Sequence, residues 1–169
     1  DIPALPQKVL VEDLVVPPYA SAVSRLHTVT GSTDYWEDYV PDERIDHPSA
    51  MTINDSDHSI ATRLYQNTAK VHFDARLMRD TAAGRRLVYG GHIISICRSL
   101  SYDGLENVLG VLAINGGTHV APTYAGDTIS CATRVLERID LGVPHLGALR
   151  LRTVGAKDVA DVSSIVIPD

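Results

Sequence analysis

The sequence predicts an α+β fold in which an antiparallel sheet packs around one unusually apolar helix. Residues 127–140 and 147–155 alternate apolar and polar side chains with the two-residue period of half-buried strands. The stretch after Gly90 and Gly91, HIISICRSLSYDGL, has little polar face before Gly104 ends it. A helix of that composition must be covered by other parts of the chain, and the strands are the elements available to cover it.

The first 33 residues are expected to form a linker or an N-terminal arm, and residues 34–169 the domain itself. The arm has one apolar stretch, residues 9–16, without sustained periodicity, and its prolines are Pro3, Pro6, Pro17 and Pro18. The following segment, YWEDYVPDERIDH, contains the only Trp and a Pro-Asp turn signal. It leads into a first strand expected over residues 44–53.

A short amphipathic helix is expected over residues 55–66. Asn54 can cap it, and Asp57 favours the positive N-terminal end of the helix. One face is apolar at helical spacing and comprises Ile60, Ala61, Leu64 and Tyr65. Residues 67–88 contain Gly84 and polar clusters, and we expect them to form a loop over this helix.

Four strands are expected after the buried helix, over residues 108–114, 127–140, 147–155 and 159–167. Asn115 and Gly116 form a dipeptide that is typical of hairpin turns. Asp127, in the block YAGDT, is expected to be structural, where a loop ends and a strand begins.

The composition limits the class of protein. A chain of 169 residues with 44% hydrophobic residues is suited to one domain with a buried core. The formal net charge of -6 argues against a nucleic-acid footprint. No apolar run approaches the roughly 18–20 residues of a membrane-spanning helix. Cys97 and Cys131 lack CxxC spacing, and no HxH or HExxH motif occurs. We therefore expect a cytoplasmic protein without a metal site, a membrane anchor or a nucleic-acid partner.

Residues 67–72, NTAKVH, resemble the signature of the MaoC-like hydratases, Asp-x-Asn-Pro-apolar-His. The positions that correspond to Asp, Asn, Pro and His of the signature are Asn67, Ala69, Lys70 and His72. Gly90 falls at the glycine that opens the central helix in that family. The resemblance implies a hot-dog fold, in which a sheet wraps around a central helix, and an acyl-CoA thioester as substrate.

Five longer blocks resemble the second half of the mesaconyl-CoA hydratases, also called β-methylmalyl-CoA dehydratases, in the same order. These blocks are ATRLYQNTAKVHF, GRRLVYGGHIIS, AINGGTH, YAGDTI and GALRLRTVGAKD. Proteins of that family have two hot-dog domains in tandem, and residues 1–33 resemble the linker between them. This chain departs from the family in lacking the first half and in running from Asp158 directly into Val159. Because one hot-dog sheet leaves open edges, we expect a homodimer or pairing with a second hot-dog domain.

The resemblance implies that His72 is the catalytic residue. An imidazole can take a proton from water and return it to carbon near neutral pH, as hydration of an enoyl thioester requires. The backbone N–H groups of Gly90 and Gly91, at the start of the buried helix, are suited to stabilise negative charge on the thioester oxygen. The chemistry needs no metal and no redox cofactor, and CoA is part of the substrate.

Asn67 stands where the family has a carboxylate. An amide cannot act as a base, but it can orient the attacking water and does not repel an acidic substrate. Candidates for binding a substrate carboxylate or the CoA phosphates are Lys70, Arg85 and Arg86, although most basic side chains are simply solvated. Tyr89 and His92 flank the glycine pair and are further candidates for substrate contact. His92 is equally suited to packing within the first helical turn.

The sequence thus favours a hydro-lyase that interconverts mesaconyl-CoA and β-methylmalyl-CoA. Two alternatives remain open. The first is a broader (R)-specific enoyl-CoA hydratase, which would turn over crotonyl-CoA faster than mesaconyl-CoA. The second is a non-catalytic hot-dog domain that binds acyl-CoA, which the departure at Asn67 permits.

Overall fold

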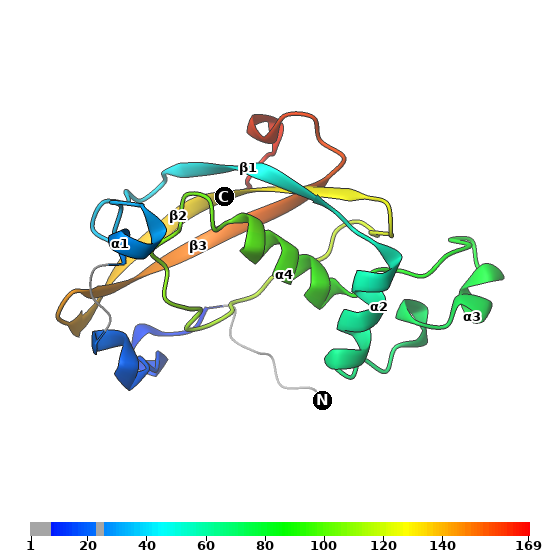
Figure 1. Cartoon of the computed structure of the whole chain (residues 1–169), viewed down its shortest axis with the longest axis horizontal. Coiled ribbons are helices and arrows are strands. Elements are labelled where there is room, and N and C mark those ends of the chain that lie inside the picture. The colour runs from blue at the N-terminus through cyan, green and yellow to red at the C-terminus, as the bar shows by residue number, and fades with distance from the viewer. Residues whose placement is uncertain (1–7, 23–25) are drawn as a thin grey trace. The chain divides into compact units, whose positions relative to one another are not determined.

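The computed structural model describes residues 8–22 and 26–169, which divide into two compact units. The first unit contains the described residues up to 44 together with 105–118 and 134–152. The second contains residues 45–104, 119–133 and 153–169. Strands β2 (Thr128–Val143) and β3 (Leu146–Lys157) run through both units. With β1 (Arg44–Thr52) they form an antiparallel sheet of order β1-β2-β3 (Figure 1).

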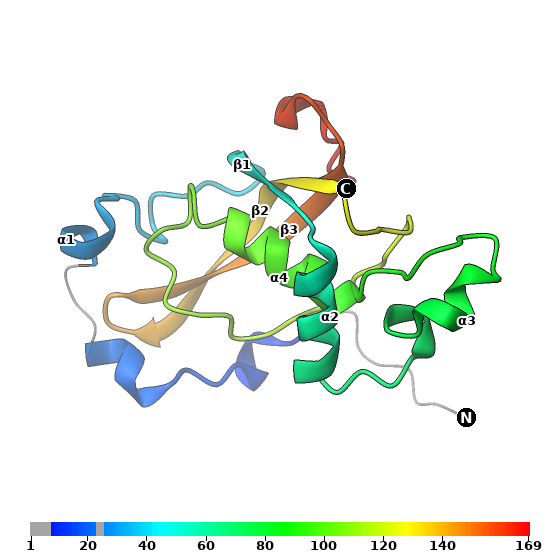
Figure 2. The same cartoon turned by 45° about the vertical axis from the view of Figure 1, so that its right-hand side comes forward.

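The helices of the second unit follow one another between β1 and the segment that leads to β2. They are α2 (Asp55–Leu64), η3 (Lys70–His72), α3 (Ala75–Arg79) and α4 (Gly90–Leu100), with η4 (Val162–Ser164) near the C-terminal end. Helix α2 lies beside α4 (Figure 2). The first unit contains η1 (Val11–Asp13), η2 (Pro18–Ala22) and α1 (His27–Thr30). Within the described residues, no helix is long and apolar enough to cross a membrane.

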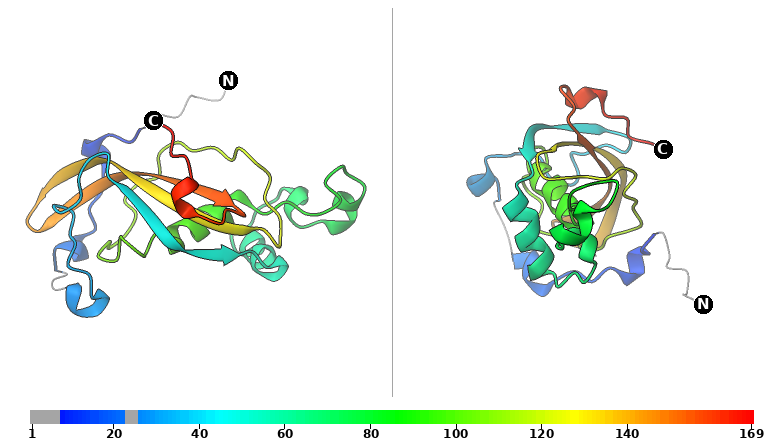
Figure 3. Two further views of the ribbon diagram at one scale, coloured as in Figure 1. Left: turned by 90° about the horizontal axis from the view of Figure 1, so that it is seen from above. Right: turned by 90° about the vertical axis from the view of Figure 1, so that its right-hand side faces the viewer.

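Helix α4 is buried against the sheet within the second unit (Figures 1 and 3). Its inner face is made of Ile93, Ile96, Cys97 and Leu100, which pack with Ile53, Val88, Ile129 and Cys131. Gly155 of β3 permits this close approach, because a Cβ there would lie 2.6 Å from Sγ of Cys97. The prediction that the sheet covers the apolar helix is therefore confirmed, and both free cysteines lie in this core.

The chain after β3 covers the opposite face of the sheet (Figure 3). Ile165 and Ile167 are buried there against Ala132 of β2. The expected strand over residues 159–167 is wrong, since this segment turns through η4 and forms no ladder. The turn is fixed by Asp161, whose side chain accepts a hydrogen bond from the backbone N–H of Ser163 at 2.9 Å. Its apolar residues bury themselves as a cover, which a two-residue period does not distinguish from a strand.

Residues 108–114 do not form the expected strand, and Asn115–Gly116 does not form a hairpin. The side-chain oxygen of Asn115 instead accepts a hydrogen bond from the backbone N–H of Val9 at 2.7 Å. The hairpin of this sheet lies between β2 and β3, where His145 adopts a left-handed φ of 64°. Both strands are longer than predicted: β2 continues to Val143 at this turn, and β3 continues to Lys157 at its other end.

Residues 67–88 were expected to form a loop, yet they contain the short helices η3 and α3. Asp74 caps α3 by accepting a hydrogen bond from the backbone N–H of Leu77 at 2.9 Å. Helices of three and five residues are too short to show a helical period, and this explains the error. The predictions of β1 and α2 are confirmed, with each element ending within two residues of its expected bounds. Asn54 occupies the N-cap position of α2 but makes no capping hydrogen bond with its side chain.

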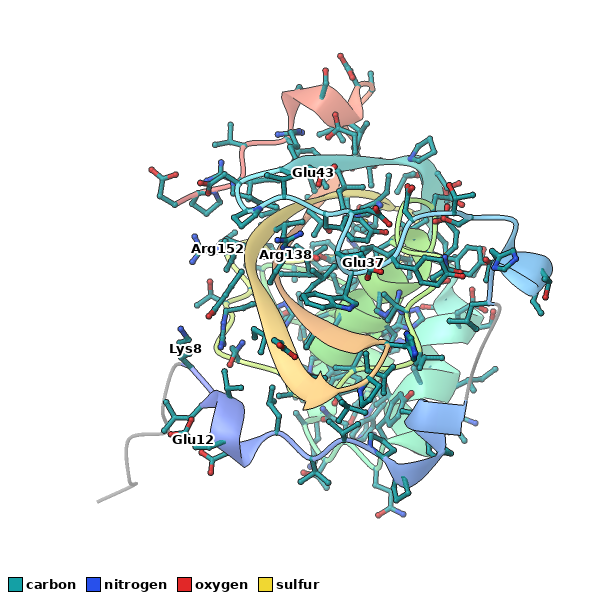
Figure 4. The ribbon with its side chains drawn as sticks, turned by 90° about the vertical axis from the view of Figure 1, so that its left-hand side faces the viewer. Lys8, Glu12, Glu37, Glu43, Arg138 and Arg152 are labelled. Carbon is teal, nitrogen blue, oxygen red and sulfur yellow. The ribbon has the colours of Figure 1, made fainter. Side chains whose placement is uncertain are left out.

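In the first unit, charged side chains bind the N-terminal arm, whose Lys8 is labelled in Figure 4. Glu137 of β2 pairs with Arg150 of β3 at 2.9 Å and with Lys8 at 3.4 Å. The Arg150 guanidinium also donates to the backbone carbonyl of Val9 at 3.4 Å. The described part of the arm is thus attached to the hairpin of its own unit, and a domain boundary at residue 34 stays a prediction.

Trp36 of the same unit packs on Gly147, where a Cβ would lie 2.1 Å from the indole ring. Arg138 lies over this ring at 5.9 Å and donates a hydrogen bond to the backbone carbonyl of Glu37 (Figure 4). The only Trp of the chain therefore closes the end of the hairpin in the first unit, which explains why aromatic residues gather ahead of β1.

A buried histidine connects three parts of the second unit. Nδ1 of His47 lies 2.7 Å from the backbone carbonyl of Asp103, so this nitrogen carries the proton. Nε2 then accepts a hydrogen bond at 2.8 Å from the hydroxyl of Thr133, which in turn lies 2.8 Å from the hydroxyl of Thr153. Because His47 has no exposed surface, its two hydrogen bonds replace those that water would otherwise provide.

The substitution Thr133→Val tests this buried chain. It removes the hydroxyl donor while keeping the volume, and leaves Nε2 of His47 buried without a partner. We expect the free energy of unfolding to fall by about 1–3 kcal/mol, measured by urea denaturation. Thr52→Val is the matched control, because the Thr52–Thr128 hydroxyl pair at 2.8 Å is exposed to solvent. Equal effects of the two substitutions would contradict a structural role for the His47 chain.

Candidate active site

One cleft of the second unit brings together most of the residues that the sequence singled out for chemistry. It has a volume of about 490 Å³ and lies between η3, the start of α4 and residues 119–123. Its lining residues are Asn67, His72, Leu87, Val88, Tyr89, Gly90, Gly91, Ile93, His119, Val120, Ala121, Pro122 and Thr123. These include no Asp, Glu, Lys or Arg, so its polar groups are two imidazoles, an amide, hydroxyls and the backbone.

His72 is held in one tautomer by the main chain. Its Nδ1 lies 3.1 Å from the backbone carbonyl of Leu87, which can only accept, so Nδ1 carries the proton. Nε2 is therefore left with a lone pair that can accept a proton. The half-buried ring also contacts the edge of Tyr89, with the two ring centroids 5.8 Å apart. This arrangement is the one that a general base requires.

The segment before α4 is bound on both sides. Leu87 makes two hydrogen bonds to the segment of His72. Its N–H donates to the carbonyl of Val71 at 3.0 Å, and its carbonyl accepts from Nδ1 of His72. The next residue, Val88, donates its N–H to the carbonyl of Thr123 at 2.9 Å. Three segments that are far apart in the sequence are thereby joined at the cleft.

Helix α4 begins at the cleft with two glycines, Gly90 and Gly91. The first amides of a helix have no carbonyl acceptor within that helix, and the helix dipole adds partial positive charge at this end. The backbone N–H groups of the glycine pair can therefore bind an oxygen that gains negative charge.

Each glycine has a neighbouring ring in the place of its missing side chain. A Cβ at Gly90 would lie 2.4 Å from Nε2 of His119, and a Cβ at Gly91 would lie 2.6 Å from the ring of Tyr89. Distances below 3 Å are shorter than contacts that real Cβ atoms make. The pair of glycines thus leaves room for two rings against the start of α4 and keeps the backbone amides accessible.

Asn67 lines the cleft with His72, as predicted from the signature. Its side-chain oxygen accepts a hydrogen bond from the backbone N–H of Ala69 at 2.8 Å, which forms a turn directly ahead of η3. Because that oxygen is already engaged, the amide nitrogen is the group left to donate a hydrogen bond to a water molecule.

The three basic candidates do not line the cleft. The exposed Lys70 begins η3, and the guanidinium of Arg85 lies 4.0 Å from the ring centroid of Tyr124. Arg86 pairs with Asp55 at the start of α2 and donates to the hydroxyl of Ser59 at 3.0 Å. The structure gives Arg86 a role in attaching the α4 entry to α2, and substrate contact by these three residues stays a prediction.

Asp55 also contacts the buried His58, whose Nε2 lies 3.2 Å from the carboxylate. Nδ1 of His58 has no hydrogen-bond partner within the described residues. The hydrogen bond from Arg86 is the main cause that holds the pKa of Asp55 below its usual range. Burial raises this pKa, and the hydrogen bond from His58 lowers it further. The ionised carboxylate is therefore the form that the fold stabilises.

The substitution Asp55→Asn is expected to lower the free energy of unfolding at pH 7, by on the order of 1 kcal/mol because the carboxylate is largely exposed. A lowered pKa stabilises the fold above the pKa of the unfolded chain, near 4, and this contribution is lost as the pH falls through the folded value. The difference from wild type should accordingly shrink as the pH falls below the unfolded value, and vanish once the carboxyl group is protonated in the folded chain as well. Denaturation at several pH values measures this, with Asp80→Asn as a surface control. A difference that persists at low pH would show that charge is not its cause.

His92 lies in the first turn of α4 but does not line the cleft. Burial is the main cause that lowers the pKa of its imidazole; the nearby Asp57 raises it and His58 lowers it further. These neighbours belong to α2, so the partly buried His92 faces that helix. Of the two interpretations of His92, the geometry favours packing, and a substrate contact by His92 stays a prediction.

His119 is the residue of the cleft that the sequence did not single out. It lies in an extended segment without regular secondary structure, and its imidazole is exposed above Gly90. The block AINGGTH was noted for its resemblance, but nothing in its spacing indicated that its histidine approaches a glycine 29 positions earlier in the chain. Only the folded structure brings the two histidines to one cleft.

No protein-family model matches the chain. It is 49% identical over 158 residues to the β-methylmalyl-CoA dehydratase of Chloroflexus aurantiacus. It is 46% identical over 156 residues to the mesaconyl-CoA hydratase of Cereibacter sphaeroides. The alignments cover 93% and 92% of this chain but 45% of each relative, so the chain spans about half the length of the curated relatives it matches.

Two solved structures are similar to this one. A MaoC domain protein dehydratase from Chloroflexus aurantiacus has a TM-score of 0.84 at 47% identity, over 94% of this chain and 46% of that one. A Mycobacterium tuberculosis protein with a double hot-dog fold has a TM-score of 0.61 at 26% identity, over 75% of this chain and 35% of that one. The predicted α+β hot-dog fold and the resemblance drawn from the motifs are therefore confirmed.

Proposed function

We propose that this chain provides the active site of a hydro-lyase that reversibly adds water to the carbon–carbon double bond of an enoyl-CoA thioester. The reaction that we assign is the interconversion of mesaconyl-CoA and β-methylmalyl-CoA, the compounds for which its two curated relatives are named. The observation that carries the proposal is His72, whose free Nε2 shares a cleft with the N-terminus of α4.

In the hydration direction, Nε2 of His72 removes a proton from water as the water oxygen forms a bond to the β-carbon. The electron pair of the double bond moves toward the α-carbon and is delocalised onto the thioester oxygen as an enolate. The imidazolium then returns its proton to the α-carbon. One water molecule has been added and the histidine is back in its starting state, so no oxidant, reductant or metal is required by the balance of the reaction.

The enolate oxygen is the point at which the protein lowers the barrier most. The N–H groups of Gly90 and Gly91 would bind it more strongly as its negative charge grows. The Leu87 carbonyl stabilises the imidazolium that forms at the same time, because it accepts from Nδ1 of His72 in both protonation states. Asn67 is placed to donate its amide N–H to the attacking water.

We further propose that the chain works beside a second hot-dog domain, in a homodimer or in a longer chain. Its two curated relatives are more than twice its length, since it covers 45% of each. A structural relative of known fold carries two hot-dog domains in one chain. An acyl-CoA thioester is the ligand that we expect the cleft to bind. A cytoplasmic location stays an expectation.

The substitution His72→Gln tests the assignment of the base. Activity is followed by loss of the enoyl-thioester absorbance of mesaconyl-CoA, and we expect kcat to fall about 10²–10⁴-fold because the proton acceptor is lost. His145→Asn is the control: it removes an imidazole from the β2–β3 turn and keeps a residue that tolerates positive φ. Full activity of His72→Gln would refute the mechanism. A wild-type chain that binds mesaconyl-CoA without turnover would support the non-catalytic alternative, and faster turnover of crotonyl-CoA the broader hydratase.

The substitution Gly90→Ala tests the backbone binding of the thioester oxygen. Its Cβ would occupy the place of His119 Nε2 and obstruct the approach to the first amides of α4. We expect kcat to fall on the order of 10²-fold. The free energy of unfolding is measured alongside, because the gain in helix propensity is opposed by the displacement of His119. Gly110→Ala is the matched control, since a Cβ there has open space around it. An active Gly90→Ala variant would exclude these amides as the oxyanion site.

A further inference from the structure

We infer that His119 binds the free carboxylate of the acyl group and so makes this cleft selective for acidic enoyl-CoA substrates. The inference rests on the proposed function, because it names the substrate class of the same site. Among the described lining residues, the ionisable side chains are those of His72, Tyr89 and His119. The hydration mechanism uses only His72, and the inference assigns a role to His119.

The first argument is the absence of any other cation at the cleft. Of the described residues that line it, only His72 and His119 can carry a positive charge. Two of the basic residues predicted to bind a carboxylate are engaged elsewhere: Arg85 on the ring of Tyr124 and Arg86 with Asp55. His72 begins each reaction cycle neutral, because its Nε2 must accept a proton. His119 is therefore the side chain of the lining that can offer a charge-assisted hydrogen bond to the substrate.

The second argument is geometric. Nε2 of His119 lies 2.4 Å from the position of a Cβ at Gly90, the residue whose N–H is assigned to the thioester oxygen. The carboxylate carbon and the thioester carbonyl carbon of a mesaconyl group are about 4 Å apart, since three carbon–carbon bonds of about 1.5 Å or less join them in trans. A substrate with its thioester oxygen at the start of α4 can therefore extend its carboxylate toward the imidazole.

The third argument is that the segment of His119 is anchored. The carbonyl of Thr123 accepts from Val88 at 2.9 Å, and the carbonyl of Pro122 accepts from Nζ of Lys157 at 3.1 Å. Among the described residues, no carboxylate lines the cleft to compete for the imidazole. The ring is exposed rather than buried in a structural network, so a ligand can reach it.

Two substitutions separate this role from proton transfer. His119→Gln keeps a hydrogen-bond donor but cannot carry a charge, and His119→Arg provides a permanent cation. We expect His119→Gln to lower the ratio of kcat/KM for mesaconyl-CoA to that for crotonyl-CoA at least tenfold, mainly through KM of mesaconyl-CoA. His119→Arg should recover part of that ratio. An unchanged ratio in His119→Gln, or an equal fall in kcat with both substrates, would overturn the inference.

Binding of saturated thioesters tests the same residue without turnover. Succinyl-CoA and butyryl-CoA have the same chain length and differ in the terminal carboxylate, and neither has a double bond to hydrate. We expect the wild-type chain to bind succinyl-CoA more tightly in calorimetry, and His119→Gln to reduce this preference at least tenfold. If the preference is present but no substrate is hydrated, the proposed function fails while the inference stands. If hydration occurs and the preference is absent or unaffected by the substitution, the inference alone fails.

Discussion

The backbone of Leu87 is the contact on which the proposed active site depends. Its N–H binds the carbonyl of Val71 and its carbonyl binds Nδ1 of His72, so one residue fixes both the main chain and the ring orientation of the catalytic segment. Three residues later the chain enters α4 at Gly90. The base and the helix N-terminus are thus held by the same short stretch of chain, and neither can shift without the other. Such joint positioning matters because small displacements of reacting groups reduce rates strongly.

The residues on either side of Leu87 extend this attachment. Arg86 pairs with Asp55 of α2, and the N–H of Val88 binds the carbonyl of Thr123. Three consecutive residues therefore connect the entry of α4 to three other segments of the unit. Two of the three attachments use backbone atoms, and each such hydrogen bond contributes only about 0.5–1.5 kcal/mol. Their value lies in fixing the position of the cleft rather than in the stability that they add.

This dependence on the backbone explains how much the sequence could predict. Periodicity identified α2, β2 and β3, because each is long enough to show its repeat. A turn signal identified β1, and the lack of a polar face indicated the burial of α4. The motif identified His72, since its residues are neighbours in the sequence. His119 was not singled out because an extended segment has no repeat, and its approach to Gly90 spans 29 positions. The error at residues 159–167 has a related origin: covering a sheet and joining it require the same apolar residues.

The two adjacent glycines at the start of α4 link the fold to substrate selection. Glycine in a helix costs about 1 kcal/mol relative to alanine, so two in succession need a compensating reason. Here the space of each missing side chain is filled by a ring, His119 at Gly90 and Tyr89 at Gly91. The glycines thus expose the backbone amides that we propose as the site of the thioester oxygen, and they also determine which rings lie beside those amides. A side chain at either position would displace the neighbouring ring and crowd the backbone amides, so the proposed catalysis and the proposed selectivity depend on the same pair of residues.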